Sequence, residues 1–213
     1  KPAPSPDPRS RAPGNLFNGK IAPLAGYAIK GAIWYQGESN AFTVEGGKFY
    51  AEQLPMLVKD WREHWAQGDF PFAWVQLPNF IGAGRDWPTV REAMLKTLAL
   101  PQTGMAITID IGDPKDIHPK NKQDVGKRLS FWALSTVYGK NVAAISGPLP
   151  AGSKVEGASI RVSLKHADGL KTRDGAAPRG LLIAATILED SIATFIDADL
   201  SPRTIHEPFT AIA

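Results

Sequence analysis

The sequence predicts an α/β protein in which a parallel sheet with helices is followed by a β-rich region. Two observations carry this prediction. Three apolar runs of strand length alternate with stretches whose apolar residues recur at helical spacing, an order typical of parallel strands joined by helices. Beyond about residue 150, polar and apolar residues alternate instead, which indicates half-buried antiparallel strands.

The first elements follow from local composition. Five prolines predict a linker over residues 1–14, because proline fixes φ and lacks an N–H. Asn18 is suited to be the N-cap of a short helix over residues 20–25. A buried strand is expected to end at Tyr35. Residues 42–47 contain a glycine pair and are predicted to form a loop.

The remaining elements of the first domain are predicted from apolar spacing and turn residues. Pro55 is expected to break or kink the first long helix, and Thr89 and Glu92 have the spacing of a capping box. The predicted helices lie at residues 49–65, 90–100 and 122–138, and the second and third strands at residues 70–77 and 104–109.

A domain boundary is expected near residues 145–150. It separates a first domain, residues 15–145, from a β-rich module, residues 146–213, with strands predicted at residues 159–165, 180–187 and 191–196. About sixty residues are few for an independent sandwich. We therefore expect this module to be incomplete.

Composition excludes several kinds of function. The net charge is +3 and no basic block occurs, so nucleic acid and anionic membranes are not indicated as partners. The absence of cysteine excludes disulfides, zinc–thiolate sites and a thiol nucleophile. No apolar run approaches membrane-spanning length. The chain starts with Lys1 and has no signal-peptide pattern, so we expect an internal piece of a longer polypeptide.

Polar clusters follow all three predicted strands, at residues 36–40, 76–79 and 110–118. Ligands of parallel sheets bind beyond the carboxyl ends of the strands. The third cluster contains His118 with Asp113 and Asp116 nearby. Histidine transfers protons near neutral pH and a carboxylate can orient it. The alternative is a surface histidine in a turn, and the residue types alone favour neither.

The cluster at residues 36–40 has two interpretations. In the first, Ser39 is the nucleophile in a loose version of the strand–turn–helix elbow, although the residues after it are poor helix formers. In the second, the Gly37 N–H and the side-chain amide of Gln36 or Asn40 stabilise an oxyanion. The attacking serine then comes from elsewhere.

Four stretches, LFNGKIAPL, IKGAIWYQGESNA, DFPFAWVQLPNF and TGMAITIDIGDPKDIHPKNKQDVGKRL, resemble the sialate O-acetylesterase family of the SGNH-hydrolase superfamily. The resemblance extends over residues 16–139 and less closely to residue 187. It implies a three-layer α/β/α, flavodoxin-like domain and a C-terminal β-sandwich. It also implies a serine hydrolase that deacetylates carbohydrates through an acyl-enzyme, needs no metal or cofactor, and is periplasmic or secreted.

The resemblance also implies roles for individual residues. His118 matches the catalytic histidine. Two segments match site-lining stretches with oxyanion or substrate contacts: Gln36, Gly37, Glu38 and Asn40 in one, and Asn18 and Gly19 in the other. The superfamily's usual aspartate precedes the histidine by three residues, where this chain has Lys115, so Asp116 and Asp113 are the available carboxylates.

This chain differs from the family at the nucleophile. The family's nucleophilic serine lies in a GQSN-type block, and no such block occurs in this chain. We therefore expect an esterase fragment whose nucleophilic serine lies outside it and which is nearly inactive alone. The alternative is a non-catalytic module that binds sugar, with Phe80 and Trp87 as stacking residues.

Overall fold

The computed structural model describes residues 14–82, 86–156, 159–171, 175, 182–185 and 192–195, the last two stretches and Val44 as backbone alone. Almost all of the predicted linker at residues 1–14 and the tail from residue 201 lie outside the described residues.

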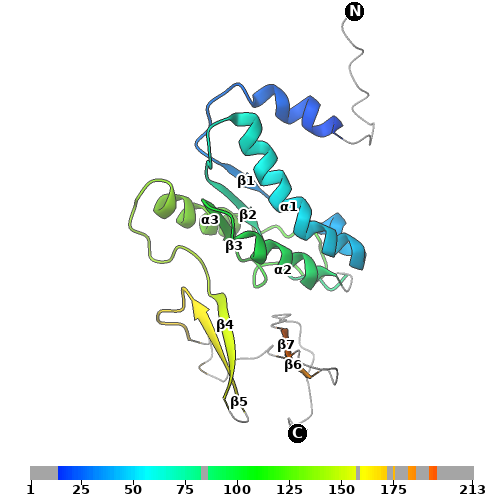
Figure 1. Cartoon of the computed structure of the whole chain (residues 1–213). Helices are drawn as coiled ribbons and strands as arrows, with labels where there is room; N and C mark the ends of the chain where they lie inside the picture. The colour runs from blue at the N-terminus through cyan, green and yellow to red at the C-terminus, as the bar shows by residue number, and fades with distance from the viewer. Residues whose placement is uncertain are drawn as a thin grey trace, which may run out of the picture.

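A parallel three-stranded sheet forms the centre of the first domain (Figure 1). Its strands lie in the order β1 (Ala32–Trp34), β2 (Phe72–Val75) and β3 (Thr103–Ala106). Both pairings are parallel, as predicted, with Ala32 opposite Phe72 and Phe72 opposite Thr103. The carboxyl ends of the strands therefore point to one edge of the sheet.

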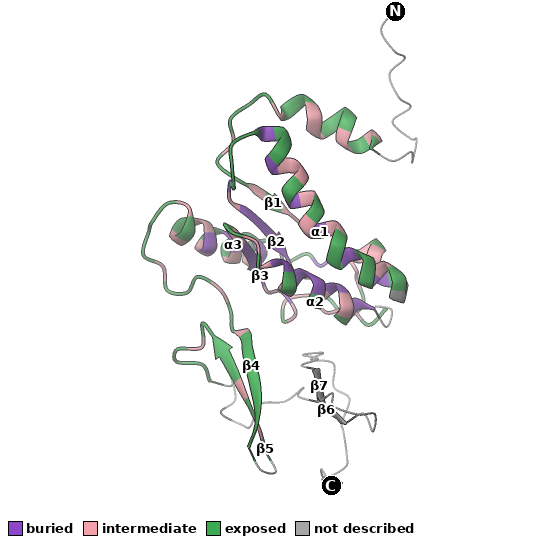
Figure 2. Ribbon diagram, in the orientation of Figure 1, coloured by how far each residue is buried: buried purple, intermediate pink, exposed green. Residues whose placement is uncertain are grey.

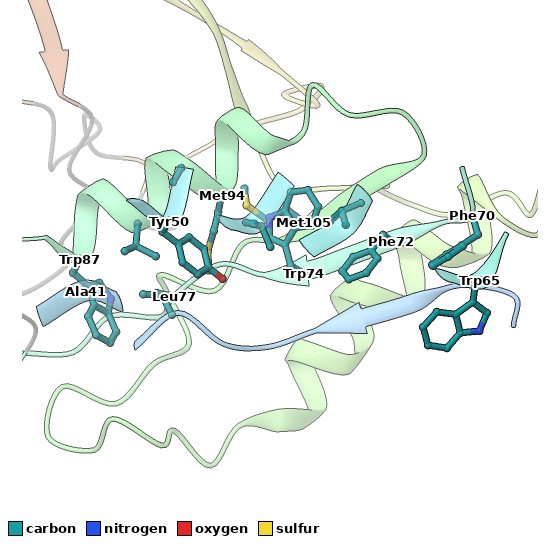
Figure 3. Close-up of a cluster of buried hydrophobic side chains, with 14 residues drawn as sticks. Ala41, Tyr50, Trp65, Phe70, Phe72, Trp74, Leu77, Trp87, Met94 and Met105 are labelled. Atoms are coloured by element: carbon teal, nitrogen blue, oxygen red, sulfur yellow. The ribbon is translucent and has the colours of Figure 1, made fainter. Parts of the chain in front are cut away.

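Helices cover both faces of β2. The helices are α1 (Val44–Trp65), α2 (Trp87–Thr97) and α3 (Lys122–Thr136). Phe72 and Trp74 pack into the cluster formed with α1 and α2, which Figure 3 shows. Ala73 and Val75, which point to the other face, pack against α3. Both faces of β2 are buried, as a central parallel strand requires.

The start of α1 corrects the loop predicted at residues 42–47. The 3₁₀ helix η3 (Glu38–Phe42) leads into α1, and Thr43 is the N-cap. Its hydroxyl accepts a hydrogen bond from the Gly46 N–H at 3.0 Å. The glycine pair lies inside the helix, and glycine is required at position 46 because a Cβ there would collide with the Asn40 carbonyl. Pro55 does not end the helix.

Two predicted helix starts are also wrong. Helix α2 begins at Trp87 with Asp86 as N-cap, so the capping box expected from Thr89 and Glu92 lies inside the helix. Proline in the first turn allows this earlier start. Near the N-terminus, the π-helix η1 (Phe17–Ile21) and the 3₁₀ helix η2 (Ala22–Leu24) place Asn18 within a helix and not at its cap.

Among the described residues of the β-rich region, β4 (Leu149–Glu156) pairs antiparallel with β5 (Ser159–Lys165), and β6 (Leu182–Ala185) with β7 (Ile192–Phe195). They form two separate two-stranded sheets, and the first is largely exposed (Figure 2). The strand predicted at residues 159–165 is confirmed. The β-sandwich stays a prediction.

None of the helices in the described part of the chain has the length and apolar character to cross a membrane.

Candidate active site

The three polar clusters follow parallel strands and so start from one edge of the sheet. Residues that flank two of these clusters contact each other across 87 positions of sequence. The Lys122 Nζ lies 4.5 Å from the centre of the Tyr35 ring and donates to its hydroxyl at 3.4 Å. Tyr35 directly precedes the cluster at residues 36–40, and Lys122 begins the helix that follows His118.

Side-chain amides hold the segment at residues 36–40 in one conformation. The Gln36 Nε2 donates to Asn40 Oδ1, and the Asn40 Nδ2 donates to Gln53 Oε1, both at 2.8 Å. The Tyr50 hydroxyl donates to the Gln36 backbone oxygen at 3.1 Å. Each amide nitrogen carries two hydrogens. The Asn40 amide is therefore oriented by its neighbours with one hydrogen left for a further acceptor.

The backbone of this segment requires glycine at its turn. Gly37 is buried, caps η3 and has a φ of 146°, a region that L-residues rarely adopt. A Cβ there would lie 3.0 Å from the Met94 Cε and 3.3 Å from the Val90 Cγ1. Ser39 is exposed on the short helix η3, and α1 begins at Val44.

The tyrosines beside this segment remain neutral at physiological pH. Burial raises the pKa of Tyr50 to about 12, and the negative charge of Glu38 adds to the shift, while the indole of Trp34 opposes it. The pKa of Tyr35 is also raised, by burial and then by Glu38. Tyr50 is thus a lasting hydrogen-bond donor to Gln36.

A cavity of about 260 Å³ lies next to the amide network. It is lined by Trp34, Gln36, Asn40, Tyr50, Gln53, Leu54 and Leu57. Both polar amides and apolar side chains therefore line this cavity. Such a mixture suits a small group with a carbonyl oxygen and a methyl.

His118 projects into solvent with 88% of its side chain exposed. Its Nδ1 lies 3.9 Å from Asp116 Oδ1, beyond hydrogen-bond distance. The same oxygen accepts the His118 backbone N–H at 2.8 Å. The carboxylate of Asp113 likewise accepts the Lys115 N–H at 2.8 Å. Both carboxylates therefore stabilise turns of the loop.

The loop that carries His118 is anchored at both ends. At its start, the Arg128 guanidinium donates to the two Asp110 carboxylate oxygens at 2.6 and 2.7 Å and also to the Ile107 carbonyl. This pairing raises the pKa of Arg128. Beside the histidine, Ile117 packs against the larger core cluster and Pro119 is buried.

The structure does not bring Asn18 and Gly19 to the other predicted site residues. Both are exposed on η1. Their neighbour Phe17 stacks edge-on against His64, with ring centres 4.7 Å apart. His64 lies in the last turn of α1, whereas the polar segment at residues 36–40 precedes the first turn of that helix. The two segments therefore lie at opposite ends of α1.

Tyr50, Gln53 and Arg128 contribute to the site but were not singled out from the sequence. A polar residue on the apolar face of a predicted helix was the available signal for the first two. Among the described residues, no group of three histidine or acidic side chains is arranged to hold a metal ion.

The sequence matches a known protein family and several known proteins. Residues 17–134 match the family model described as "Carbohydrate esterase, sialic acid-specific acetylesterase". A sialate O-acetylesterase of Mus musculus is 34% identical over 155 residues, 63% of this chain and 28% of that protein. The human sialate O-acetylesterase is 33% identical over 156 residues, covering 63% and 29%.

A solved structure is also similar. It is a carbohydrate acetylesterase from Xanthomonas citri, with a TM-score of 0.76 and 40% identity, matched over 84% of this chain and 42% of that chain. The chain thus spans less than half the length of each of these relatives.

Proposed function

Because the chain belongs to the sialic acid-specific acetylesterase family of carbohydrate esterases, we propose that the polypeptide containing it removes O-acetyl groups from sugars. The observation that carries the proposal is that two polar segments, residues 36–40 and the loop with His118, start from one sheet edge and are linked by the contact between their flanking residues Tyr35 and Lys122. Both lie inside the matched residues. The reaction is acyl transfer to a serine, followed by hydrolysis of the acyl-enzyme.

His118 acts as general base and then as general acid. It takes the proton of the serine hydroxyl during attack on the acetyl carbonyl and returns it to the departing sugar oxygen. In the second half it activates a water molecule. Its exposed imidazole supports this role because a substrate can reach a side chain that the protein does not cover.

The segment at residues 36–40 stabilises the oxyanion that forms on the acetyl carbonyl. We assign the donors to the Gly37 N–H, to the second amide hydrogen of Asn40 and to Gln36. The amide network supports this role, because donors fixed before the reaction need no reorganisation in the transition state. Glu38 contacts substrate at the rim in this proposal.

Asp116 stabilises the imidazolium form of His118 through space, because its carboxylate is the closer of the two candidates. Asp113 contributes through the turn that it caps. We place the nucleophile on a serine outside residues 36–40. The position of Ser39 within the 3₁₀ helix η3, and not at the start of α1 as a nucleophile elbow requires, supports this placement.

The parallel sheet with helices on both faces belongs, in this proposal, to a flavodoxin-like SGNH-hydrolase domain over residues 15–145. The paired strands of residues 146–213 belong to a β-sandwich module.

The test is acetate release by the full-length polypeptide from p-nitrophenyl acetate and from an O-acetylated sugar. His118→Ala should lower kcat roughly 10²–10⁴-fold, the contribution of a general acid–base. The matched control His64→Ala, on an exposed histidine of α1, should retain activity.

Ser39→Ala should also retain activity. A complete loss of activity in this variant would instead identify Ser39 as the nucleophile. A wild-type protein that binds sugar without cleaving esters would establish the binding module.

A further inference from the structure

The loop that carries His118 runs beside the loop that follows β2. The pairing of β2 with β3 continues just beyond the end of β2, where the Gln76 N–H donates to the Ala106 carbonyl, in the last residue of β3, at 2.9 Å. Further along, the Asn79 Oδ1 accepts the Gly112 N–H at 2.8 Å. The Ile81 N–H then donates to the Pro114 carbonyl at 3.0 Å. The β2 loop thus supports the first part of the histidine loop, as far as Pro114.

The contact between Asn79 and Gly112 is unusually close. A Cβ atom on Gly112 would collide with the backbone oxygen and the side-chain oxygen of Asn79. Glycine is required here so that the two loops approach closely enough for the hydrogen bond. The bond is specific because it uses a side-chain oxygen directed at one backbone N–H, 33 positions away in sequence.

The position of the His118 imidazole depends on this support. The side chain is 88% exposed and lies 3.9 Å from the nearest carboxylate oxygen, so its own contacts do not orient it. Its position follows from the backbone of the loop. A chain of turns connects that backbone to Gly112: the Asp116 N–H donates to the Asp113 carbonyl at 3.3 Å, and the His118 N–H donates to the Asp116 carboxylate at 2.8 Å.

We propose that Asn79 is a positioning residue for the reaction, which holds the His118 loop at Gly112 and thereby sets where the imidazole stands. This inference rests on the proposed function. Asn79 acts through the loop and not on the substrate. Misplacement of a reacting group by about 1 Å can cost roughly 10²-fold in rate, so loss of the contact should reduce kcat while leaving substrate binding nearly intact.

The experiment compares three variants of the full-length polypeptide. Asn79→Ala should lower kcat roughly 10–100-fold and change KM less than about 3-fold. Asn79→Asp keeps an oxygen that accepts the Gly112 N–H and should recover most of the activity. Asn141→Ala is the matched control, because Asn141 is exposed in the loop after α3, and it should match the wild type.

Hydrogen–deuterium exchange supplies a readout that does not need turnover. Asn79→Ala should accelerate exchange in residues 107–121, and the Asp and Asn141 variants should not. Unchanged kcat in Asn79→Ala overturns the proposal. A fall in kcat without faster exchange, or without recovery in Asn79→Asp, also overturns it and indicates a direct substrate contact.

Two further outcomes, a variant that does not fold and a wild type without esterase activity, can be told apart from a failure of this proposal. If Asn79→Ala does not fold, Gly112→Ala, which forces the loops apart, should give the same loss of kcat, and full activity in that variant refutes the proposal. If the wild type cleaves no acetyl ester, the proposed function fails. The exchange measurement then still decides whether Asn79 holds the loop.

Discussion

Replacing Gly37 by alanine tests the central turn of the candidate site. Gly37 has a φ of 146° and caps η3, and its carbonyl accepts the Asn40 N–H at 3.0 Å. This backbone places Gln36 and Asn40 at hydrogen-bond distance from each other. Alanine strongly disfavours that φ, so the substitution strains the turn or reshapes it.

Two contributions determine the size of the effect. Holding a non-glycine residue in a sparsely populated backbone region costs about 1–3 kcal/mol. The added methyl group also meets Met94 Cε at 3.0 Å, Val90 Cγ1 at 3.3 Å and Leu77 Cδ2 at 3.4 Å. The end of a methionine side chain can move, so crowding adds about 1 kcal/mol, the lower end of overpacking costs. The free energy of unfolding should therefore fall by about 2–4 kcal/mol.

Urea unfolding followed by tryptophan fluorescence measures this change. With a slope of about 2 kcal/mol per molar urea, the middle of the usual range, the midpoint should fall by roughly 1–2 M. Gly26→Ala is the matched control, because a Cβ there meets nothing within 4 Å and Gly26 is outside the positive-φ glycines. A Gly37→Ala protein as stable as the wild type would refute the reasoning about strain at this turn.

Three other predictions concern single contacts. Arg62→Leu should lower the free energy of unfolding, measured with urea, by about 1–3 kcal/mol, because it leaves the buried Phe70 carbonyl without its donor at 2.9 Å, while kcat stays unchanged. For Tyr50, the folded-state pKa of about 12 exceeds the ordinary 10.0, so the unfolded state ionises first as the pH rises. Its contribution to stability is complete below pH 10 and decreases between about pH 10 and 12 by up to about 1.4 kcal/mol per pH unit. Tyr50→Phe should remove this part of the pH dependence of the unfolding free energy, while the smaller part from Tyr35 remains. Arg128→Lys loses the two-pronged pairing with Asp110 and should lower the melting temperature by roughly 2–4 °C, the effect of about 1 kcal/mol in a chain of this size; an unchanged melting temperature would show that this ion pair adds nothing.

The order of strands and helices was predictable because it is expressed in short stretches. Apolar runs such as residues 72–75 and helical spacing over residues 49–65 are local patterns. The start of α1 was less predictable, because Thr43 caps a helix whose first turn contains two glycines. These glycines weaken the intrinsic preference for helix. Their packing against neighbouring segments outweighs that weakness.

The sequence by itself determined the parallel α/β order and the polar clusters at the strand ends, including His118, because each depends on neighbouring residues. The tertiary structure alone decided which residues meet there. Asn40 bonds to Gln53 across 13 positions, Gly112 to Asn79 across 33, and Asn18 lies with the far end of α1. Such contacts depend on how helices and loops pack against the sheet. Local patterns do not specify that packing.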